Sequence, residues 1–109
     1  MTIDFNLMEE NAMESFCGGD GVFCAKIFND GTNKILKGTL KTGCSIGLHC
    51  HETSSEIIYV LEGEGEMLCE GETEILRAGD CHYCKKGESH SFRNKNEKDL
   101  VFFAVVPQQ

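Results

Sequence analysis

Three histidines and one glutamate are the residues of this sequence whose spacing most clearly supports chemistry: His49, His51, Glu56 and His90. In an extended strand, His49 and His51 point to the same face about 7 Å apart, so both imidazoles can reach one ion at about 2.1 Å. Glu56 follows a short polar loop and can offer a carboxylate to that ion, and His90 begins a later strand. These four residues predict a site for one divalent transition metal ion.

The donor set leaves the metal and the reaction open. Imidazole and carboxylate ligands suit Mn, Fe, Co, Ni, Cu and Zn. An ion that prefers six ligands would keep two positions for water, oxygen or a chelating small molecule, and it would act as a Lewis acid or an oxygen activator. We therefore predict a metal-dependent enzyme of the dioxygenase, isomerase or decarboxylase type, acting on a small polar metabolite. The alternative is non-catalytic binding or sensing of a sugar or small organic acid through the metal.

Short strands must position these ligands. From Val22 onward, apolar residues alternate with polar ones, and glycine-containing turns recur at close spacing. Nine strand segments are expected: 22–28, 34–41, 45–51, 57–62, 65–70, 73–77, 81–85, 90–95 and 100–106. Eight or nine short strands with tight turns are typical of an all-β sandwich or small barrel.

Alternation through segment 45–51 assigns side chains to faces. Gly47 is expected on the face of the two ligand histidines, and Ile46, Leu48 and Cys50 are expected on the opposite face. Cys50 therefore stands between two predicted ligands without being one itself.

The N-terminal residues differ from the rest of the chain. Asn6 followed by Glu9 resembles a helix-capping box. Apolar residues recur there at helical spacing: Met8, Ala12 and Phe16. We predict an N-terminal arm of residues 1–21 with a short helix or turn, followed by a single barrel domain of residues 22–109.

Two strand segments, 57–61 and 100–106, are apolar on both faces. One face can line the interior of the domain, and the other must be covered by a second sheet or a second subunit. We predict a homodimer.

The composition of the chain limits which partners it can bind and where in the cell it is expected. The formal charge is −8, from 18 acidic and 10 basic residues, which argues against nucleic acid and anionic membranes as partners. No apolar run approaches the length of a membrane span, and no secretory signal is visible. The odd number of cysteines, 7, favours free thiols and a cytoplasmic location. Cys81 and Cys84 point to opposite faces of a strand, so their sulfurs should not meet.

The two glycine-framed segments resemble the two sequence motifs of the cupin superfamily. The first motif is matched by Gly43, His49, His51, Glu56 and Gly63; the second is matched by Gly79, Gly87, His90 and Asn94, with Lys85 in place of a proline. The 15 residues between the motifs are similar to the short spacer of small single-domain cupins. The resemblance implies a double-stranded β-helix, or jelly-roll barrel, with these histidines and the glutamate as metal ligands. It says little about the reaction, because cupins include dioxygenases, decarboxylases, isomerases, sugar binders and storage proteins.

The same resemblance implies that the face of segment 81–85 that carries His82 turns inward. His82 is therefore the candidate catalytic acid or base of the cavity, and the alternative is a packed or surface histidine. Phe92 and Asn94 share the alternation of His90 and are expected to line the same cavity.

The replacement of the motif proline by Lys85 has two expected effects. Without the fixed φ of proline, the loop that delivers His90 should be looser. Lys85 and Lys86 also place positive charge near that loop, where they would either draw an anionic substrate or simply be solvated.

Overall fold

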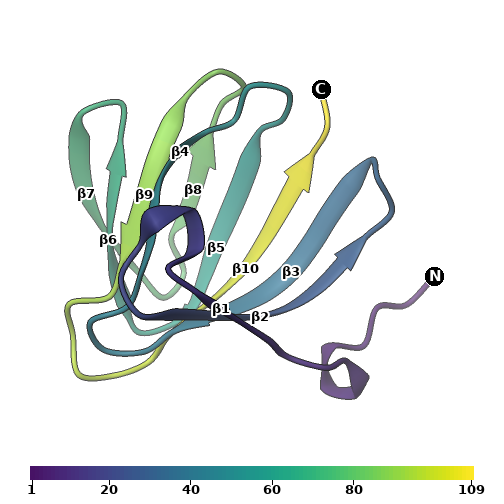
Figure 1. Cartoon of the computed structure of the whole chain (residues 1–109), viewed down its shortest axis with the longest axis horizontal. Helices are drawn as coiled ribbons and strands as arrows, with labels where there is room; N and C mark the ends of the chain where they lie inside the picture. Colours follow the sequence, from purple (N-terminus) through teal and green to yellow (C-terminus); the bar gives the residue numbers. More distant parts are fainter.

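The computed structural model describes residues 1–109 and consists of two facing antiparallel sheets (Figure 1). The strands are β1 (Asn11–Glu14), β2 (Val22–Asn29), β3 (Asn33–Leu40), β4 (Ser45–Cys50), β5 (Glu56–Glu62), β6 (Glu64–Cys69), β7 (Glu72–Arg77), β8 (Cys81–Cys84), β9 (Ser89–Arg93) and β10 (Leu100–Pro107). One sheet has six strands in the order β1-β2-β3-β10-β5-β8, and the other has four in the order β4-β9-β6-β7. The predicted all-β class and all nine expected strands are confirmed, and the architecture is a jelly-roll sandwich.

The predicted short N-terminal helix or turn is present only as 3-10 turns, and no α-helix forms there. The helical content consists of two three-residue 3-10 turns, η1 (Phe5–Leu7) and η2 (Phe16–Gly18). Between them, β1 pairs with the edge strand β2 over four residues, from Asn11 opposite Ala25 to Glu14 opposite Val22. Helical spacing over so few residues is weak, and backbone hydrogen bonds offered by an exposed sheet edge outweigh it. No helix in the structure has the length and apolar character needed to cross a membrane.

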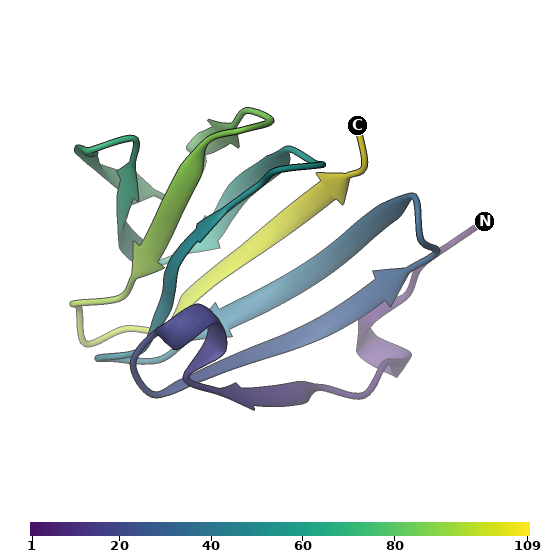
Figure 2. The same cartoon turned by 45° about the horizontal axis from the view of Figure 1, so that its top comes forward.

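The N-terminal arm wraps around the sandwich and ends against the four-stranded sheet. Figure 2 shows the arm passing along β2 and then turning at η2 beside β4. A Cβ atom on Gly47 would overlap the Cys17 carbonyl, and one on Gly19 would overlap the Ser45 carbonyl. Two glycines therefore allow η2 to lie directly on the backbone of β4.

The hydrophobic core fills the space between the sheets. Its fully buried members include Leu40, Ile58, Val60, Met67, Phe92, Leu100 and Phe102. Phe102 stacks on Phe23 and meets Phe92 edge-on, with ring centroids 5.8 and 5.3 Å apart. The side chains of alternate residues along β5 point inward, so this core holds both sheets at a fixed separation.

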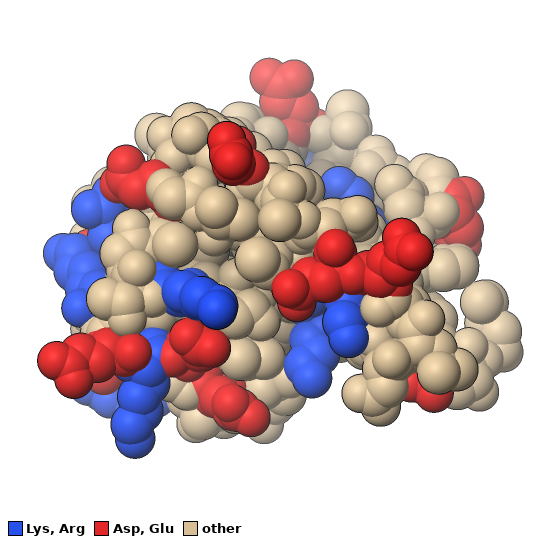
Figure 3. Space-filling view, turned by 60° about the horizontal axis from the view of Figure 1, so that its bottom comes forward, with Lys and Arg blue, Asp and Glu red and all other residues tan.

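The outer surface has two characters. On the face shown in Figure 3, lysine and arginine side chains are interspersed with acidic ones. Ion pairs on the surface include Lys95–Glu66 (2.9 Å). The outer face of β5 and β8 instead exposes apolar and aromatic side chains: Ile57, Tyr59, Leu61 and Tyr83. These four residues are called the β5–β8 outer face below.

Candidate metal site

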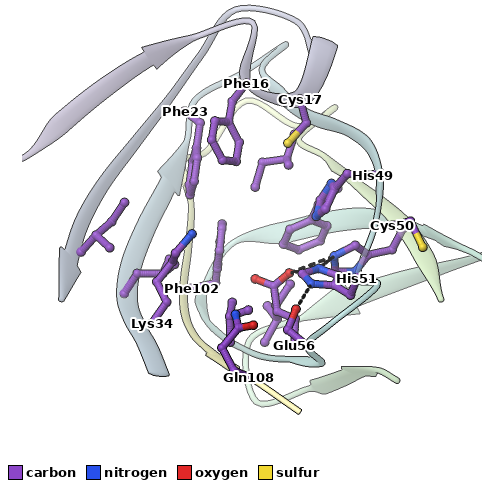
Figure 4. Close-up of a pocket in the computed structure, with 18 residues that line it drawn as sticks. Phe16, Cys17, Phe23, Lys34, His49, Cys50, His51, Glu56, Phe102 and Gln108 are labelled. Carbon is purple, nitrogen blue, oxygen red and sulfur yellow. Dashed lines mark hydrogen bonds and ion pairs between the residues drawn. The ribbon is translucent and has the colours of Figure 1, made fainter. Parts of the chain in front are cut away.

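The structure brings the four predicted ligands together at one end of the sandwich interior (Figure 4). Glu56 Oε1 lies 3.1 Å from His51 Nε2 and 2.9 Å from His90 Nε2, and these two nitrogens are 3.0 Å apart. The His49 ring completes the group, with its centroid 4.9 Å from that of His51 and 4.7 Å from that of His90. One donor atom from each residue lies within 4.8 Å of the others.

Both sheets contribute to this cluster. His49 in β4 lies directly opposite His90 in β9, so the two imidazoles share one face of the four-stranded sheet. His51 follows β4, and its backbone is held by hydrogen bonds with the loop before β9: its N–H donates to Glu88 (3.0 Å), and its carbonyl accepts from Gly87 (2.6 Å). Glu56 begins β5 in the opposite sheet. The site therefore depends on the two sheets packing together.

A β-bulge in β4 corrects one expectation about faces. The register with β9 shifts between Ile46 and His49, so one extra residue lies in β4 there. Ile46 was expected to point away from His49, but it is buried and lines the cavity with it. A bulge reverses the alternation of side chains beyond it. Gly47, at the bulge, is also the residue over which the arm packs.

Each of the three predicted ligand histidines has a partner for its second ring nitrogen. His49 Nδ1 lies 2.8 Å from the Gly47 carbonyl oxygen, and His51 Nδ1 lies 3.0 Å from Ser54 Oγ. His90 Nδ1 lies 3.1 Å from His82 Nε2. Such partners fix the ring orientation and allow the proton to reside on Nδ1, which leaves Nε2 free to bind a cation. The Ser54 hydroxyl and the His82 ring can each donate or accept, so they suit His51 and His90 with or without a metal.

The electrostatics of the cluster favour a cation. Burial by itself would raise the pKa of Glu56, but hydrogen bonds from His51 and His90 outweigh it and lower the pKa to about 2. Burial lowers the pKa of His49, opposed by the Gly47 carbonyl. A buried carboxylate and a neutral imidazole are the protonation states that metal ligation requires. The donor set thus fits a divalent transition metal ion.

A cavity of about 300 Å³ opens in front of the cluster. Most of its wall is apolar and includes Phe23, Ile46, Ile58, Phe92 and Phe102. The lining residues that the sequence did not indicate include Phe16, Cys17, Lys34 and Gln108. No local pattern marks them, because they come from the arm, from β3 and from the C-terminus. Lys34 lies on the wall opposite the histidines (Figure 4).

The structure places His82 outside this cavity. His82 is buried, and its Nε2 faces Nδ1 of His90, on the side of that ring away from Glu56. Its Nδ1 lies 3.8 Å from Glu74 Oε1, and it lines a separate surface hollow. His82 faces the interior, as the family resemblance implies, but it lies behind His90 and does not line the cavity. Burial lowers its pKa, and the neighbouring His90 adds to this effect.

Two other expectations change in detail. Phe92 lines the cavity as expected, but Asn94 does not. Asn94 is fully buried, and its side-chain amide donates to the carbonyls of Leu40 (2.8 Å) and Lys98 (2.9 Å), so it fixes the loop between β9 and β10.

The loop before β9 also differs from the expectation of looseness. The Lys85 N–H donates to Glu88 Oε1 (2.8 Å), and the Glu88 N–H donates to the Lys85 carbonyl (3.0 Å). A proline at position 85 would lack that donor, so the Glu88 carboxylate replaces the rigidity of a proline ring. Lys85 and Lys86 are exposed and line no part of the main cavity.

The fold and the site define a class: a small jelly-roll protein with three histidines and one glutamate converging at the end of an interior cavity. The chain matches the model of the Cupin domain family over residues 37–106, and it belongs to that family. No curated protein sequence matches it.

Solved structures agree with this assignment. A predicted oxalate decarboxylase from Thermotoga maritima is 30% identical, with a TM-score of 0.94 over 100% of both chains. A sugar phosphate isomerase from Silicibacter pomeroyi is 18% identical, with a TM-score of 0.82 over 100% of this chain and 76% of the other. KdgF from Halomonas sp. is 22% identical, with a TM-score of 0.71 over 91% of this chain and 87% of the other. The last two show the fold alone.

Proposed function

We propose that this cupin is a metal-dependent enzyme that converts a small carboxylic acid, such as a 2-oxo or 2-hydroxy acid. His49, His51, Glu56 and His90 hold the ion, which would supply Lewis acidity or oxygen activation when bound. The observation that carries the proposal is the convergence of these four donors on a cavity. Among the reaction types, we favour decarboxylation, because the relative that is 30% identical is named a predicted oxalate decarboxylase.

Lys34 supports an acid as the substrate. It is half-buried and lines the cavity wall facing the metal cluster, and the ion pairs of the chain do not include it. An ammonium in partly apolar surroundings attracts a carboxylate more strongly than a solvated lysine does. A carboxylic acid that reaches both the metal ligands and Lys34 is therefore oriented along the cavity, and Phe23 and Phe102 keep water from its flank.

The test begins with elemental analysis of untagged protein purified without added metal. Protein loaded with each metal is then supplied with small 2-oxo, 2-hydroxy and dicarboxylic acids, and carbon dioxide release and oxygen consumption are followed. Glu56→Gln should abolish metal retention and turnover together. A wild-type protein that takes up no divalent ion on titration would overturn the proposal.

Lys34→Met tests the substrate class. Loss of one partly buried ion pair costs about 1.4 kcal/mol, so KM for the acid should rise about tenfold. Lys37→Met is the matched control, because Lys37 lies on the same strand but is exposed and lines no part of the cavity. An equal effect of both substitutions would show that general charge, rather than Lys34, attracts the acid.

A second candidate function is binding of such an acid without turnover. Apart from the four metal ligands, the ionisable residues that line the cavity are Cys17, Lys34 and Cys50. No further histidine or carboxylate is present there to transfer protons. Calorimetry that shows saturable binding of an acid to metal-loaded protein, with no product formed, would favour this function.

We also propose that the protein is a cytoplasmic homodimer with no nucleic-acid or membrane partner. The β5–β8 outer face, which exposes Tyr83 by 53% and Tyr59 by 43%, supports a second copy as the covering partner. The net charge of −8 supports the absence of polyanionic partners.

A further inference from the structure

A second group of metal-ligating side chains lies behind His90. Cys69 at the end of β6 and His82 and Cys84 in β8 bring one donor atom each within 4.8 Å of one another. None of the three lines the main cavity. As expected from alternation, Cys84 does not pair with Cys81, which is exposed on the other face of β8. Cys84 lies on the buried face of β8 and contacts Cys69 of the facing sheet instead.

These residues adjoin a hollow that is open to solvent and rich in carboxylates. The hollow has a volume of about 500 Å³, and Cys69 and His82 form part of its wall. Its other charged residues are Glu70, Glu72, Glu74, Glu88 and Lys85. Four carboxylates against one ammonium favour a cation there, and the hollow gives it a path of entry.

The donors specify the kind of cation. Two thiols and one imidazole are soft ligands, which select Zn²⁺ and related ions over Mg²⁺ or Ca²⁺. In a tetrahedral site with bonds of about 2.1–2.3 Å, donor atoms lie about 3.5–3.8 Å apart. The three donors already lie within 4.8 Å of one another, so shifts on the order of 1 Å would close the site.

We propose that Cys69, His82 and Cys84 form a second metal site, for a thiophilic divalent cation such as Zn²⁺. Glu74 lies outside this group of three, but its side chain is exposed and its Oε1 lies 3.8 Å from His82 Nδ1, so a change of rotamer would bring it in as the fourth ligand. We call this group of Cys69, His82 and Cys84 the rear site, and the group of His49, His51, Glu56 and His90 the front site. The rear site has a different donor set from the front site and does not depend on the proposed catalysis.

The thiol protons must leave when the cation binds. Burial raises the pKa of the Cys84 thiol to about 12, and the neighbouring Cys69 and Glu56 add to this effect. Burial likewise raises the pKa of Cys69. The free site therefore holds two thiols, and binding of the cation releases both protons to solvent.

The rear site is coupled to the front site through the two stacked rings of His82 and His90, whose centroids are 5.3 Å apart. A cation on His82 Nδ1 requires the proton of that ring to sit on Nε2, where it is donated to His90 Nδ1. A cation on His90 Nε2 requires the opposite arrangement. Each cation therefore weakens binding of the other, and the rear site is best measured with the front site disabled.

The experiment uses a full-length front-site variant, His49→Ala/His51→Ala, titrated with Cd²⁺ under reducing conditions. The measured quantities are the bound stoichiometry and the ultraviolet charge-transfer absorption of cadmium thiolates. One equivalent should bind with that absorption, and adding Cys69→Ser should abolish both. Adding Cys81→Ser instead should change neither, because Cys81 is exposed and lies outside the cluster.

Cys69 is only partly buried, so Cys69→Ser tests the site with less risk to folding than a change at the fully buried Cys84. Circular dichroism and thermal unfolding of the metal-free variants confirm that each is folded before titration. A folded front-site variant that shows no thiolate absorption with Cd²⁺ would overturn the proposal. Equal loss of binding with Cys69→Ser and Cys81→Ser would do the same.

Discussion

Ser54→Ala is the substitution that most directly tests how the front site is built. The Ser54 hydroxyl lies 3.0 Å from His51 Nδ1, and both side chains are buried. Alanine removes the hydroxyl without adding volume. The backbone bridge between Ser54 and Gln108 does not involve the side chain and should persist.

The expected loss follows from the role of that hydrogen bond. Without it, the His51 ring loses the partner that fixes its orientation and that accepts a hydrogen bond from its Nδ1–H when Nε2 binds a cation. Loss of such a partner lowers metal affinity by about 10- to 100-fold, or about 1.4–2.7 kcal/mol. At a metal concentration that saturates both proteins, the metal-induced stabilisation falls by the same amount. The rise in Tm on adding metal should therefore be smaller by roughly 5–15 °C.

The assay compares thermal unfolding of wild-type and variant protein with and without the metal found by elemental analysis, and calorimetry gives the affinities. Ser55→Ala is the matched control: Ser55 is the next residue and is also buried, but its hydroxyl bonds to none of the four ligands. If Ser54→Ala binds metal within twofold of wild type, or if Ser55→Ala loses as much affinity, then the Ser54–His51 contact does not orient the ligand.

Three further predictions test the site and the surface. In metal-free protein, the pKa of Glu56 is about 2 when folded against 4.5 in its ordinary state, so its carboxylate stabilises the fold above pH 4.5 and loses this effect as the pH falls toward 2. In Glu56→Gln, the unfolding free energy measured by urea unfolding should therefore vary less between pH 4.5 and pH 2, with at most about 3 kcal/mol of the variation removed. An unchanged dependence on pH would contradict the lowered pKa of Glu56. His82→Gln should lower front-site metal affinity by about tenfold through His90 and leave the shape of the pH–rate profile unchanged, whereas loss of one limb of that profile would restore His82 as an acid or base in the reaction. Tyr59→Lys should convert the dimer to monomer in sedimentation at micromolar concentration, and Ile75→Lys, on the exposed face of the other sheet, should not; a monomeric wild type would remove the dimer proposal.

The sequence alone determined the strands from β2 onward and the identity of the four side chains that converge. Alternation and turn residues act over a few positions, so segments such as 34–41 could be recognised without knowledge of their neighbours. The segments that carry these side chains are equally local: one residue separates His49 from His51, and a short loop leads to Glu56. The N-terminal segment forms only 3-10 turns and a strand because β1 pairs along β2, a contact that local spacing does not describe.

Only the tertiary structure decided what surrounds those ligands. The bulge that turns Ile46 inward arises where β4 meets both β9 and the arm. Lys34 enters the cavity from β3, and His82 lies behind His90 because β8 and β9 belong to sheets that face each other. These placements depend on contacts between residues far apart in the chain, and strand periodicity assigns a side chain to a face without specifying what it will meet there.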